Sequence, residues 1–423
     1  MPKNSIKTNT SQSFIDLFAG CGGFSVGLGR AEWKGIFAIE KDSMAFKTFK
    51  HNLLDGAFQH YSWPQWLPKE ATTVQSLLKN YSEELESLRG RVDLLAGGPP
   101  CQGFSIAGQR NSRDPRNKLS QHYVKVVSLV RPKLLIIENV RGFNSVFSRC
   151  SSSSSKVPYS SVVKKKLEDI GYTVFQNYVH CERFGVAQLR TRFIMIGVLN
   201  EIFFQKEQSP FDLLEETRKS FLDTKGLPDR PVTVEEAIND LETCCRGAKL
   251  IMHSGSEKHC FKQLDYKVPE TLNAYQSAMR RGLNGQIPNS LRLAKHRPST
   301  VSRFKMIQDI CSNGGKLSKS DREALGIKKQ VLNVLDANKA SNTLTTLPDD
   351  LLHYSEPRIL TVRESARIQS FPDNFAFKGK YSTGGHLRAK ECPRYTQVGN
   401  AIPPLLAEAL GVVLKDYLID EKV

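Results

Sequence analysis

The feature that most constrains this chain is a series of short, wholly apolar runs that alternate with helical stretches. The runs lie at residues 13–18, 35–40, 91–96, 133–138 and 192–199. Runs that are apolar at every position, rather than at alternate positions, indicate strands that are covered on both faces. Their alternation with helices predicts an α/β fold: a Rossmann-like, mostly parallel sheet with helices on both faces.

The helices that we expect begin directly after the strands. Residues 24–31 follow a glycine-rich turn, and residues 44–54 follow the second strand. Near the end of the chain, the spacing predicts a helix over 361–372 that Pro372 closes. A last amphipathic helix follows the double proline at 403–404 and should pack back on the first domain.

The alternation of strands and helices stops near residue 205. The segment 275–330 holds twelve Lys and Arg but three acids, an excess of nine within a chain whose net charge is +17. We therefore predict a first domain over 1–204, a smaller basic domain over 205–345 and a C-terminal part over 346–423 that returns to the first domain. The charge favours a polyanionic partner but does not separate DNA, RNA and a membrane surface, and a solvated basic surface is the alternative.

Composition excludes several classes of protein. No run of about 18 apolar residues is present, so we expect no membrane span, and the polar N-terminal residues predict no signal peptide. The nine cysteines include no CxxC spacing. We therefore expect neither a disulfide framework nor a metal site, and a reducing cytoplasm as the location.

The first motif with chemical meaning is DLFAGCGG over residues 16–23. A strand that ends in glycines before a helix lets a ligand approach the backbone. Glu40 ends the next strand, where a carboxylate can accept hydrogen bonds from ribose hydroxyls. The spacing departs from GxGxxG, so a cofactor with a ribose and no phosphate, such as S-adenosylmethionine, fits better than a dinucleotide. A tight turn without a ligand is the alternative.

A second motif, GGPPCQGFS over residues 97–105, presents Cys101 at another strand end. Cysteine is the strongest uncharged nucleophile near neutral pH where its thiolate is favoured. Glu138, in Glu-Asn-Val, ends the following strand and could donate a proton into the same cleft. Taken alone, the cysteine could be a small buried side chain and the glutamate a helix cap.

A third motif, QLRTR over residues 188–192, leads into the last apolar run. Alternate residues of an extended segment point to one face, so Gln188, Arg190 and Arg192 should project together. Two guanidinium groups suit a phosphate or a base carbonyl, and a surface ion-pair cluster is the alternative.

Taken together, these segments resemble the C5-cytosine DNA methyltransferase family, of the bacterial restriction-modification type. FIDLFAGCGGFSVGL, GGPPCQGFS, ENV and FGVAQLRTRFIMIG match its motifs in order, and RILTVRESARIQSFPDNF and QVGNAIPPLLAEAL match its two C-terminal motifs. The matches cover residues 13–200 and 339–415. A single match could be accidental, whereas an ordered set is specific.

The resemblance implies roles for individual residues. Cys101 should attack C6 of a cytosine flipped out of duplex DNA, and Glu138 should bind N3 and the exocyclic amine. Arg192 should reach O2, and Arg190 should help to hold the catalytic loop. Phe18 should lie against the adenine of S-adenosylmethionine. The cofactor residues that we expect are Phe18, Ala19, Gly20, Gly22, Gly23, Glu40, Pro99 and Asn400.

The resemblance also implies that the basic domain reads the target sequence. The DNA contacts that we expect are Gln102, Ser105, Arg110, Gln188, His296, Arg297 and Arg303. It implies a monomer in the bacterial cytoplasm, associated with the nucleoid through double-stranded DNA and protecting it from a cognate restriction endonuclease without a stable complex.

Two departures and three alternatives remain. The family's adenine-binding acid is replaced by Thr73-Val74, and the segment 55–91 has no assigned role. The alternatives are a tRNA cytosine-5 methyltransferase, a catalytically inactive DNA-binding relative, and a nicotinamide-dependent oxidoreductase. Gly103 and the long basic segment favour DNA over tRNA, the intact catalytic residues disfavour an inactive relative, and no pyrophosphate loop supports the oxidoreductase.

Overall fold

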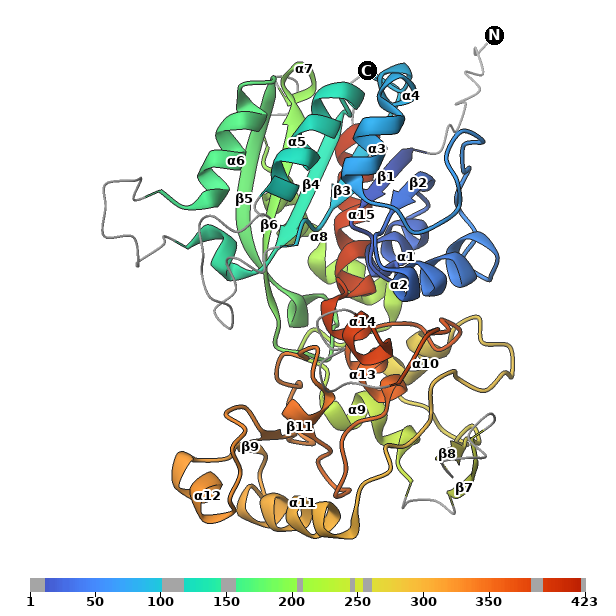
Figure 1. The fold of residues 1–423 in the computed structure, drawn as a ribbon, viewed down its shortest axis with the longest axis vertical. Coiled ribbons are helices and arrows are strands. Elements are labelled where there is room, and N and C mark those ends of the chain that lie inside the picture. Colours follow the sequence, from blue (N-terminus) through green and yellow to red (C-terminus); the bar gives the residue numbers. More distant parts are fainter. Residues whose placement is uncertain are drawn as a thin grey trace.

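The structure, a computed structural model, shows two lobes stacked along the long axis of the molecule (Figure 1). They are joined through the helices α13 (Val362–Ile368), α14 (Arg394–Asn400) and α15 (Pro404–Ile419). The upper lobe holds a six-stranded sheet, and the lower lobe holds short helices and small sheets. The residues that the structure describes are 12–100, 118–145, 157–203, 208–243, 248–253, 261–381 and 391–419.

The six-stranded sheet has the order β2-β1-β3-β4-β6-β5. Neighbouring strands from β2 to β4 are parallel, whereas β6 runs antiparallel to both β4 and β5. This mostly parallel sheet with helical layers confirms the expected α/β class. Its strands are β1 (Ser13–Leu17), β2 (Lys34–Ile39), β3 (Leu94–Gly97), β4 (Leu134–Asn139), β5 (Tyr172–His180) and β6 (Thr191–Leu199).

The strand β5 has no counterpart among the apolar runs of the sequence. It lies at the edge of the sheet, and three of its nine residues, at 173, 175 and 176, are half-buried while three more, at 177, 178 and 180, are exposed. An edge strand needs no continuous apolar run, because one side of it meets solvent. The run at 91–96 likewise begins too early, since the strand β3 starts at Leu94.

Helices cover both faces of this sheet. One face packs against α3 (Val74–Asn80), α4 (Ser82–Ser87), α5 (Lys118–Val130) and α6 (Tyr159–Glu168). The other packs against α1 (Gly23–Arg30), α2 (Ser43–Phe49), α8 (Pro210–Lys225) and α15 (Pro404–Ile419). The short helix α7 (Asn200–Phe203) follows β6. Burial on both faces explains why most strands are apolar throughout.

The helix expected over 44–54 divides in two. The helix α2 ends at Phe49, and a π-helical segment, η1 (Lys50–Leu54), continues from it. Single π-helical turns are rare and occur frequently at functional sites. Here the widened turn places Leu53 against the glycine-rich turn of the first motif.

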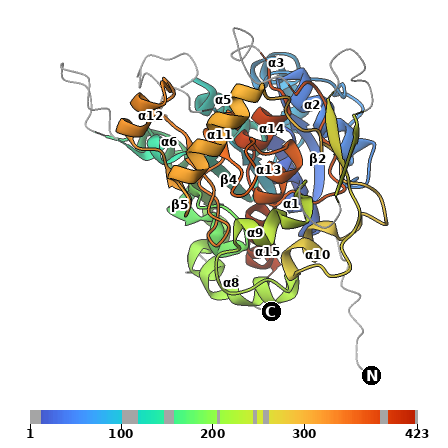
Figure 2. The same cartoon turned by 90° about the horizontal axis from the view of Figure 1, so that it is seen from below.

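The lower lobe surrounds two smaller apolar cores. One gathers Phe304, Leu332 and Leu352, and the other gathers Leu264 and Tyr266. Seen from below, α11 and α12 lie toward one side of α13 and α14 (Figure 2). The helices are α9 (Val234–Ile238), α10 (Ala274–Arg280), α11 (Pro298–Ile310), α12 (Lys319–Ala324), α13 (Val362–Ile368) and α14 (Arg394–Asn400), and the strands are β7 (Lys249–Met252), β8 (Lys262–Asp265), β9 (Gly315–Lys316), β10 (Asn333–Val334) and β11 (Leu351–Leu352).

The helix α13 is buried although its sequence, VRESARI, is largely polar. Its Arg367 pairs with Asp240 at 3.0 Å and with Asp373 at 2.6 Å, and all three side chains are closed to solvent. Buried charges require such partners, because an unpaired charge away from water is very costly. The pairs hold α13 to the start of the lower lobe, whereas its length is shorter than the expected 361–372 because the chain turns at Ser370, where φ is +64°.

One segment, Arg394–Leu418, is long and apolar enough to cross a membrane, but 78% of its most apolar stretch of 18 residues is buried inside the molecule. Its helix α15 packs against α1 and α8 in the upper lobe. The segment therefore has the burial of a core helix.

Candidate active site

The glycine-rich turn after β1 and the acid after β2 form one unit. Phe18, Gly20 and Gly22 all have positive φ angles, of 61°, 58° and 98°. Glu40 accepts hydrogen bonds from the N–H of Gly20 at 2.9 Å and from the N–H of Asp42 at 2.7 Å. Burial raises the pKa of the Glu40 carboxyl, and those two N–H groups act in the opposite sense. The backbone turn and the carboxylate predicted from separate strands are thus brought into contact.

The glycines of this turn serve different purposes. A Cβ at Gly22 would lie 2.4 Å from Cδ1 of Leu53, and one at Gly23 would lie 2.4 Å from the carbonyl oxygen of Ile402. A Cβ at Gly20 would meet nothing within 4 Å. Gly22 and Gly23 therefore allow close packing, whereas Gly20 faces open space beside Glu40, where a ligand could lie.

A buried polar chain lies beneath this turn. Ser25 donates a hydrogen bond to Asp16 at 2.5 Å and lies 2.7 Å from the hydroxyl of Tyr61. Burial raises the pKa of Asp16 to about 7, with Glu40 adding to the effect. Tyr61 belongs to the segment 55–91, to which the sequence assigned no role. Its ring packs against Phe14 and Phe49, so this segment supports the glycine-rich turn from behind.

Glu138 and Arg192 meet at the carboxyl end of β4. Oε1 of Glu138 lies 2.5 Å from Nε of Arg192, and the two side chains are 14% and 10% exposed. Burial raises the pKa of Glu138, although the guanidinium opposes this effect. The pair is thus an almost buried carboxyl group with a raised pKa beside a guanidinium group that keeps its proton.

Asn139, which sequence reasoning passed over, fixes the chain that leads to Cys101. Its Nδ2 donates to the carbonyl oxygen of Pro99 at 3.1 Å, and its Oδ1 accepts from the N–H of Val140 at 3.0 Å. Oε2 of Glu138 lies 3.3 Å from the place of a Cβ on Gly98. The segment GGPP at 97–100 therefore lies against Glu-Asn-Val at 138–140. The asparagine in Glu-Asn-Val was the sequence feature from which this contact could have been predicted.

Arg190 and Gln188 are buried and bind backbone. Arg190 donates to the carbonyl oxygens of Leu344 at 3.0 Å and Gly399 at 2.9 Å. Gln188 is fully buried, bonds to Gln369 and accepts the N–H of Leu344 at 2.9 Å. The expectation that Gln188 contacts DNA is therefore corrected: its amide is committed to the interior, where it joins the two lobes.

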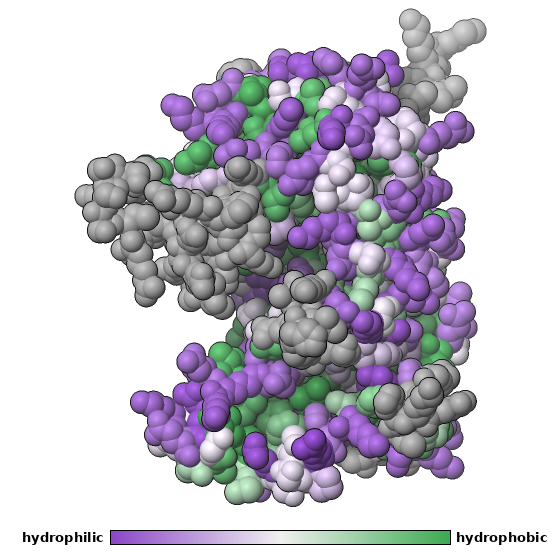
Figure 3. All heavy atoms as spheres, in the orientation of Figure 1, coloured by the Kyte–Doolittle hydropathy of each residue, from purple (hydrophilic) through white to green (hydrophobic). Residues whose placement is uncertain are grey.

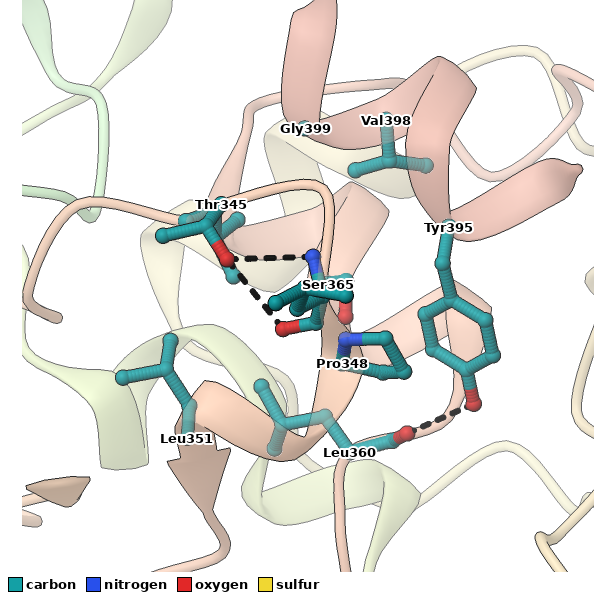
Figure 4. Close-up of a pocket in the computed structure, with 10 residues that line it drawn as sticks. Thr345, Pro348, Leu351, Leu360, Ser365, Tyr395, Val398 and Gly399 are labelled. Carbon is teal, nitrogen blue, oxygen red and sulfur yellow. Dashed lines mark hydrogen bonds between the residues drawn. The ribbon is translucent and has the colours of Figure 1, made fainter. Parts of the chain in front are cut away.

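The contact between these motifs is tight. Gly399 lies against residue 345 so closely that a Cβ on it would be 2.3 Å from the carbonyl oxygen of Thr345. Figure 4 shows Thr345, Pro348, Tyr395 and Gly399 around a remaining hollow of about 10 Å³. This volume is at most that of a water molecule, so the hollow is not a cofactor site.

Comparison with known proteins identifies this arrangement. The profile of the C-5 cytosine-specific DNA methylase family matches residues 12–416. The chain belongs to the C-5 cytosine-specific DNA methylase family. The chain is therefore a cytosine C5 methyltransferase that acts on DNA, which confirms the resemblance and disfavours a nicotinamide-dependent oxidoreductase.

Individual relatives of this C-5 cytosine-specific DNA methylase span nearly the whole chain. The Type II methyltransferase M.DdeI of Desulfomicrobium norvegicum is 30% identical over 414 residues, covering 96% of this chain and 89% of its own. M1.HphI of Haemophilus parahaemolyticus is 28% identical and covers 96% of this chain and 87% of its own.

Solved structures show the same fold. An Escherichia coli protein described as a DNA modification methyltransferase encoded within a prophage has a TM-score of 0.64 at 24% identity, covering 97% of this chain and all of its own. The methyltransferase EhMeth of Entamoeba histolytica has a TM-score of 0.51 at 15% identity, covering 97% and 98%.

The remaining expected residues of the methylase divide into three groups. Cys101, Gln102, Ser105 and Arg110 lie outside the described residues. His296 faces inward: its ring packs on Phe304 with centroids 5.1 Å apart, and its Nε2 accepts the N–H of Ile359 at 3.5 Å. Exposed side chains are found at Arg297, Arg303 and Asn400.

No group of three or more His, Cys, Asp and Glu side chains that could hold a metal ion occurs within the described ranges.

Thr73 stands where the family pattern has an acid. It caps α3, and its hydroxyl accepts the N–H of Ser76 at 3.0 Å. Thr72 lies beside it and donates its N–H to the carbonyl oxygen of Glu40 at 2.8 Å. At this position the chain thus contacts Glu40 through a backbone N–H and carries a threonine in place of an acid.

Proposed function

We propose that this methylase is a site-specific enzyme that flips a cytosine out of duplex DNA, adds Cys101 to C6 and methylates C5. The observation that carries the proposal is the buried pair Glu138–Arg192 at the end of β4, next to the Pro99 carbonyl that Asn139 fixes. The pair combines a carboxyl with a raised pKa and a cation that cannot lose its proton.

The residues after β1 and β2 fit S-adenosylmethionine. Gly20 faces open space, and Glu40 presents a carboxylate beside it, suited to ribose hydroxyls. Phe18 is half-buried next to them and offers a ring for the adenine. We assign these three residues to the cofactor, together with Ala19, Pro99 and Asn400, while Gly22 and Gly23 permit the packing. S-adenosylmethionine would supply the methyl group.

The protein groups then account for the activation of the base. C5 of cytosine is a weak nucleophile, and addition of the Cys101 thiolate at C6 moves electron density onto C5. A proton from Glu138 at N3 stabilises the charge that develops, and its raised pKa favours the protonated acid. After C5 has taken the methyl group, a base removes the C5 proton, the N3 proton returns to Glu138, and the Cys101 thiolate leaves C6, which restores the neutral ring. A stacked base cannot be reached in this way, so the base must leave the duplex.

Arg192 and Arg190 have distinct proposed roles. Arg192 lies beside Glu138 and would reach O2 of the same base while it holds the carboxyl in place. Arg190 donates to the carbonyls of Leu344 and Gly399 and would fix the junction between the lobes rather than touch the base. The first is catalytic in this proposal, and the second is a positioning residue.

We further propose that the lower lobe reads the target sequence. The molecule is hollowed on one side between the two lobes (Figure 3). Arg297, just before α11, and Arg303, on α11, are exposed on the lower lobe and are candidate phosphate or base contacts. Because α8 packs on α15 in the upper lobe, we place the start of the recognition domain near residue 233 rather than 205.

The named relatives are Type II methyltransferases, and we propose that this enzyme likewise protects DNA from a cognate restriction endonuclease. It would act as a monomer in the bacterial cytoplasm, without a stable complex with that endonuclease. Expression of the chain in a methylation-deficient host followed by bisulfite sequencing should reveal one modified sequence context. Scattered or absent modification would contradict site specificity.

The covalent mechanism has its own test. Cys101→Ser should abolish methyl transfer while duplex binding persists, and a duplex containing 5-fluorocytosine at the modified position should trap the unaltered enzyme as a covalent adduct. Normal turnover by the serine variant would contradict covalent catalysis by Cys101. Transfer of labelled methyl to tRNA but not to DNA would show that the nucleic-acid assignment is wrong.

A further inference from the structure

A pair of hydrogen-bond donors lies close to Glu138 without an assigned role. Arg141 opens the short helix η3 (Arg141–Asn144), three residues after Glu138, and its side chain is exposed. Its guanidinium carbon lies 5.6 Å from the ring centroid of Tyr178 on β5, which is 37% exposed. The pair therefore combines an aromatic ring and a cation at the surface.

The hydroxyl of Tyr178 is oriented by a chain of hydrogen bonds. Ser160, which is fully buried, donates to Oδ1 of Asn144 at 2.6 Å. That bond leaves Nδ2 of Asn144 to donate to the Tyr178 hydroxyl at 3.0 Å. Since the phenol oxygen accepts this bond, its own proton remains available for an external acceptor.

Among the described residues, no carboxylate forms an ion pair with Arg141. The neighbouring acid Glu182 binds His180 at 3.3 Å and the N–H of Arg190 at 3.3 Å. The exposed Arg141 guanidinium and the partly exposed Tyr178 phenol thus offer only hydrogen-bond donors to a ligand at this surface. A ligand that only accepts hydrogen bonds and carries negative charge, such as a phosphate diester, matches this donor set.

The position along the sheet fits a nucleic-acid strand. Asn139 and Tyr178 are both paired with Phe193, from opposite sides of β6. Two strand spacings place their backbones about 10 Å apart, at the end of the sheet where β4 finishes. Tyr178 shares its face of the sheet with Asn139 and Phe193, the face opposite to Glu138, but Arg141 follows Glu138 by three residues and lies at most about 11 Å from it along the chain. A phosphate bound by the pair would therefore belong to the strand that carries the base reaching Glu138.

We infer that Arg141 and Tyr178 form a clamp for a DNA backbone phosphate beside the extruded cytosine. The inference rests on the proposed function, because it assumes that Glu138 receives that base. The clamp would anchor the strand while the base leaves the stack, so that the flipped nucleotide is positioned by a contact that carries no sequence information.

The test is the salt dependence of duplex binding by the full chain. Arg141→Gln should lower the slope of log Kd against log salt concentration by about 0.9, the value for one phosphate contact. The matched control is Arg131→Gln. Arg131 lies just before β4, at the opposite end of the strands, and pairs with Glu201 at 3.0 Å. This variant should keep the slope of the unaltered enzyme. An unchanged slope for Arg141→Gln, or an equal loss for the control, would overturn the clamp.

Tyr178→Phe keeps the ring and removes the donor. It should weaken duplex binding about three- to tenfold with no change in the salt slope, the loss expected for one hydrogen bond. Unchanged affinity would remove Tyr178 from the clamp. Binding of S-adenosylhomocysteine and the unfolding temperature serve as folding checks, and if Arg141→Gln does not fold, Arg141→Lys should retain the slope but bind more weakly. Failure of the unaltered enzyme to trap 5-fluorocytosine would refute the proposed function and leave these slopes unaffected.

Discussion

At the scale of single residues, three carboxyl groups at the carboxyl ends of the parallel strands share a raised pKa. Burial raises the pKa of Asp16, Glu40 and Glu138, although each has a hydrogen-bond or charge partner. The desolvation of a carboxylate therefore outweighs the partner at each of these positions. Such raised values cluster where proteins bind ligands or move protons.

Glu138 should be required in its protonated form. Glu138→Gln cannot transfer a proton to N3, so single-turnover methyl transfer should fall about 10²- to 10⁴-fold while duplex binding persists. For the unaltered enzyme, a raised folded-state pKa means that the active acid is present at low pH and is lost as pH rises through that pKa. The variant should lack this decline. A rate within a few-fold of the original would exclude proton donation by Glu138.

Asp16 should make stability depend on pH. Its pKa in the folded state is about 7, above the ordinary value of 3.8, so the stabilising protonated form is fully present below about 4 and is lost as pH rises through about 7. Asp16→Asn retains an acceptor for Ser25 and carries no charge. The unfolding temperature of the variant relative to the original should therefore rise from pH 5 to pH 8. The exposed Asp55→Asn is the control, and equal shifts for both would refute a special role of Asp16.

At the scale of elements, the motifs make contact because their backbones approach closely. Arg190 binds the carbonyls of Leu344 and Gly399, and Gln188 binds the N–H of Leu344. The segment 341–345 thereby lies along the strand that leads into β6. One stretch of chain thus connects the catalytic sheet, the lower lobe and α14.

Gly399 should be indispensable for this contact. Gly399→Ala places a methyl group 2.3 Å from the carbonyl oxygen of Thr345, a backbone atom that cannot rotate away. The variant should lose about 1–3 kcal/mol of stability in denaturant unfolding. Gly326→Ala, where a Cβ meets nothing within 4 Å, should cost about 1 kcal/mol at most from its positive φ. If both variants lose the same stability, the close approach is not what selects glycine.

At the scale of the whole molecule, the arginines are divided between a buried site in the upper lobe and the exposed surface of the lower lobe. Arg192 is buried beside Glu138, whereas Arg297 and Arg303 are exposed on the lower lobe. Some basic side chains of the lower lobe are already paired, since Lys305 binds Asp309 at 3.0 Å and Lys329 binds Asp349 at 2.7 Å. The net charge therefore overstates the number of phosphates that this lobe can bind.

The two groups of arginines should separate in a salt titration. Arg297→Gln and Arg303→Gln should each lower the slope of log Kd against log salt by about 0.9 if each meets one phosphate. Arg192→Gln should instead lower the rate of methyl transfer and leave the slope unchanged, because its guanidinium is bound to Glu138. A slope change for Arg192→Gln, with none for the exposed pair, would reverse this division.

The sequence by itself determined the α/β class, the family and the order of the motifs, because these depend on local patterns: apolar runs for buried strands, and glycines where the backbone turns. It could not determine that Glu138 meets Arg192, that Asn139 holds Pro99, or that Gln188 lies inside rather than on DNA. These contacts join residues from 40 to more than 180 positions apart. Only the packing of the sheet and the two lobes decides them, since burial and partner choice are properties of the folded chain and not of a segment.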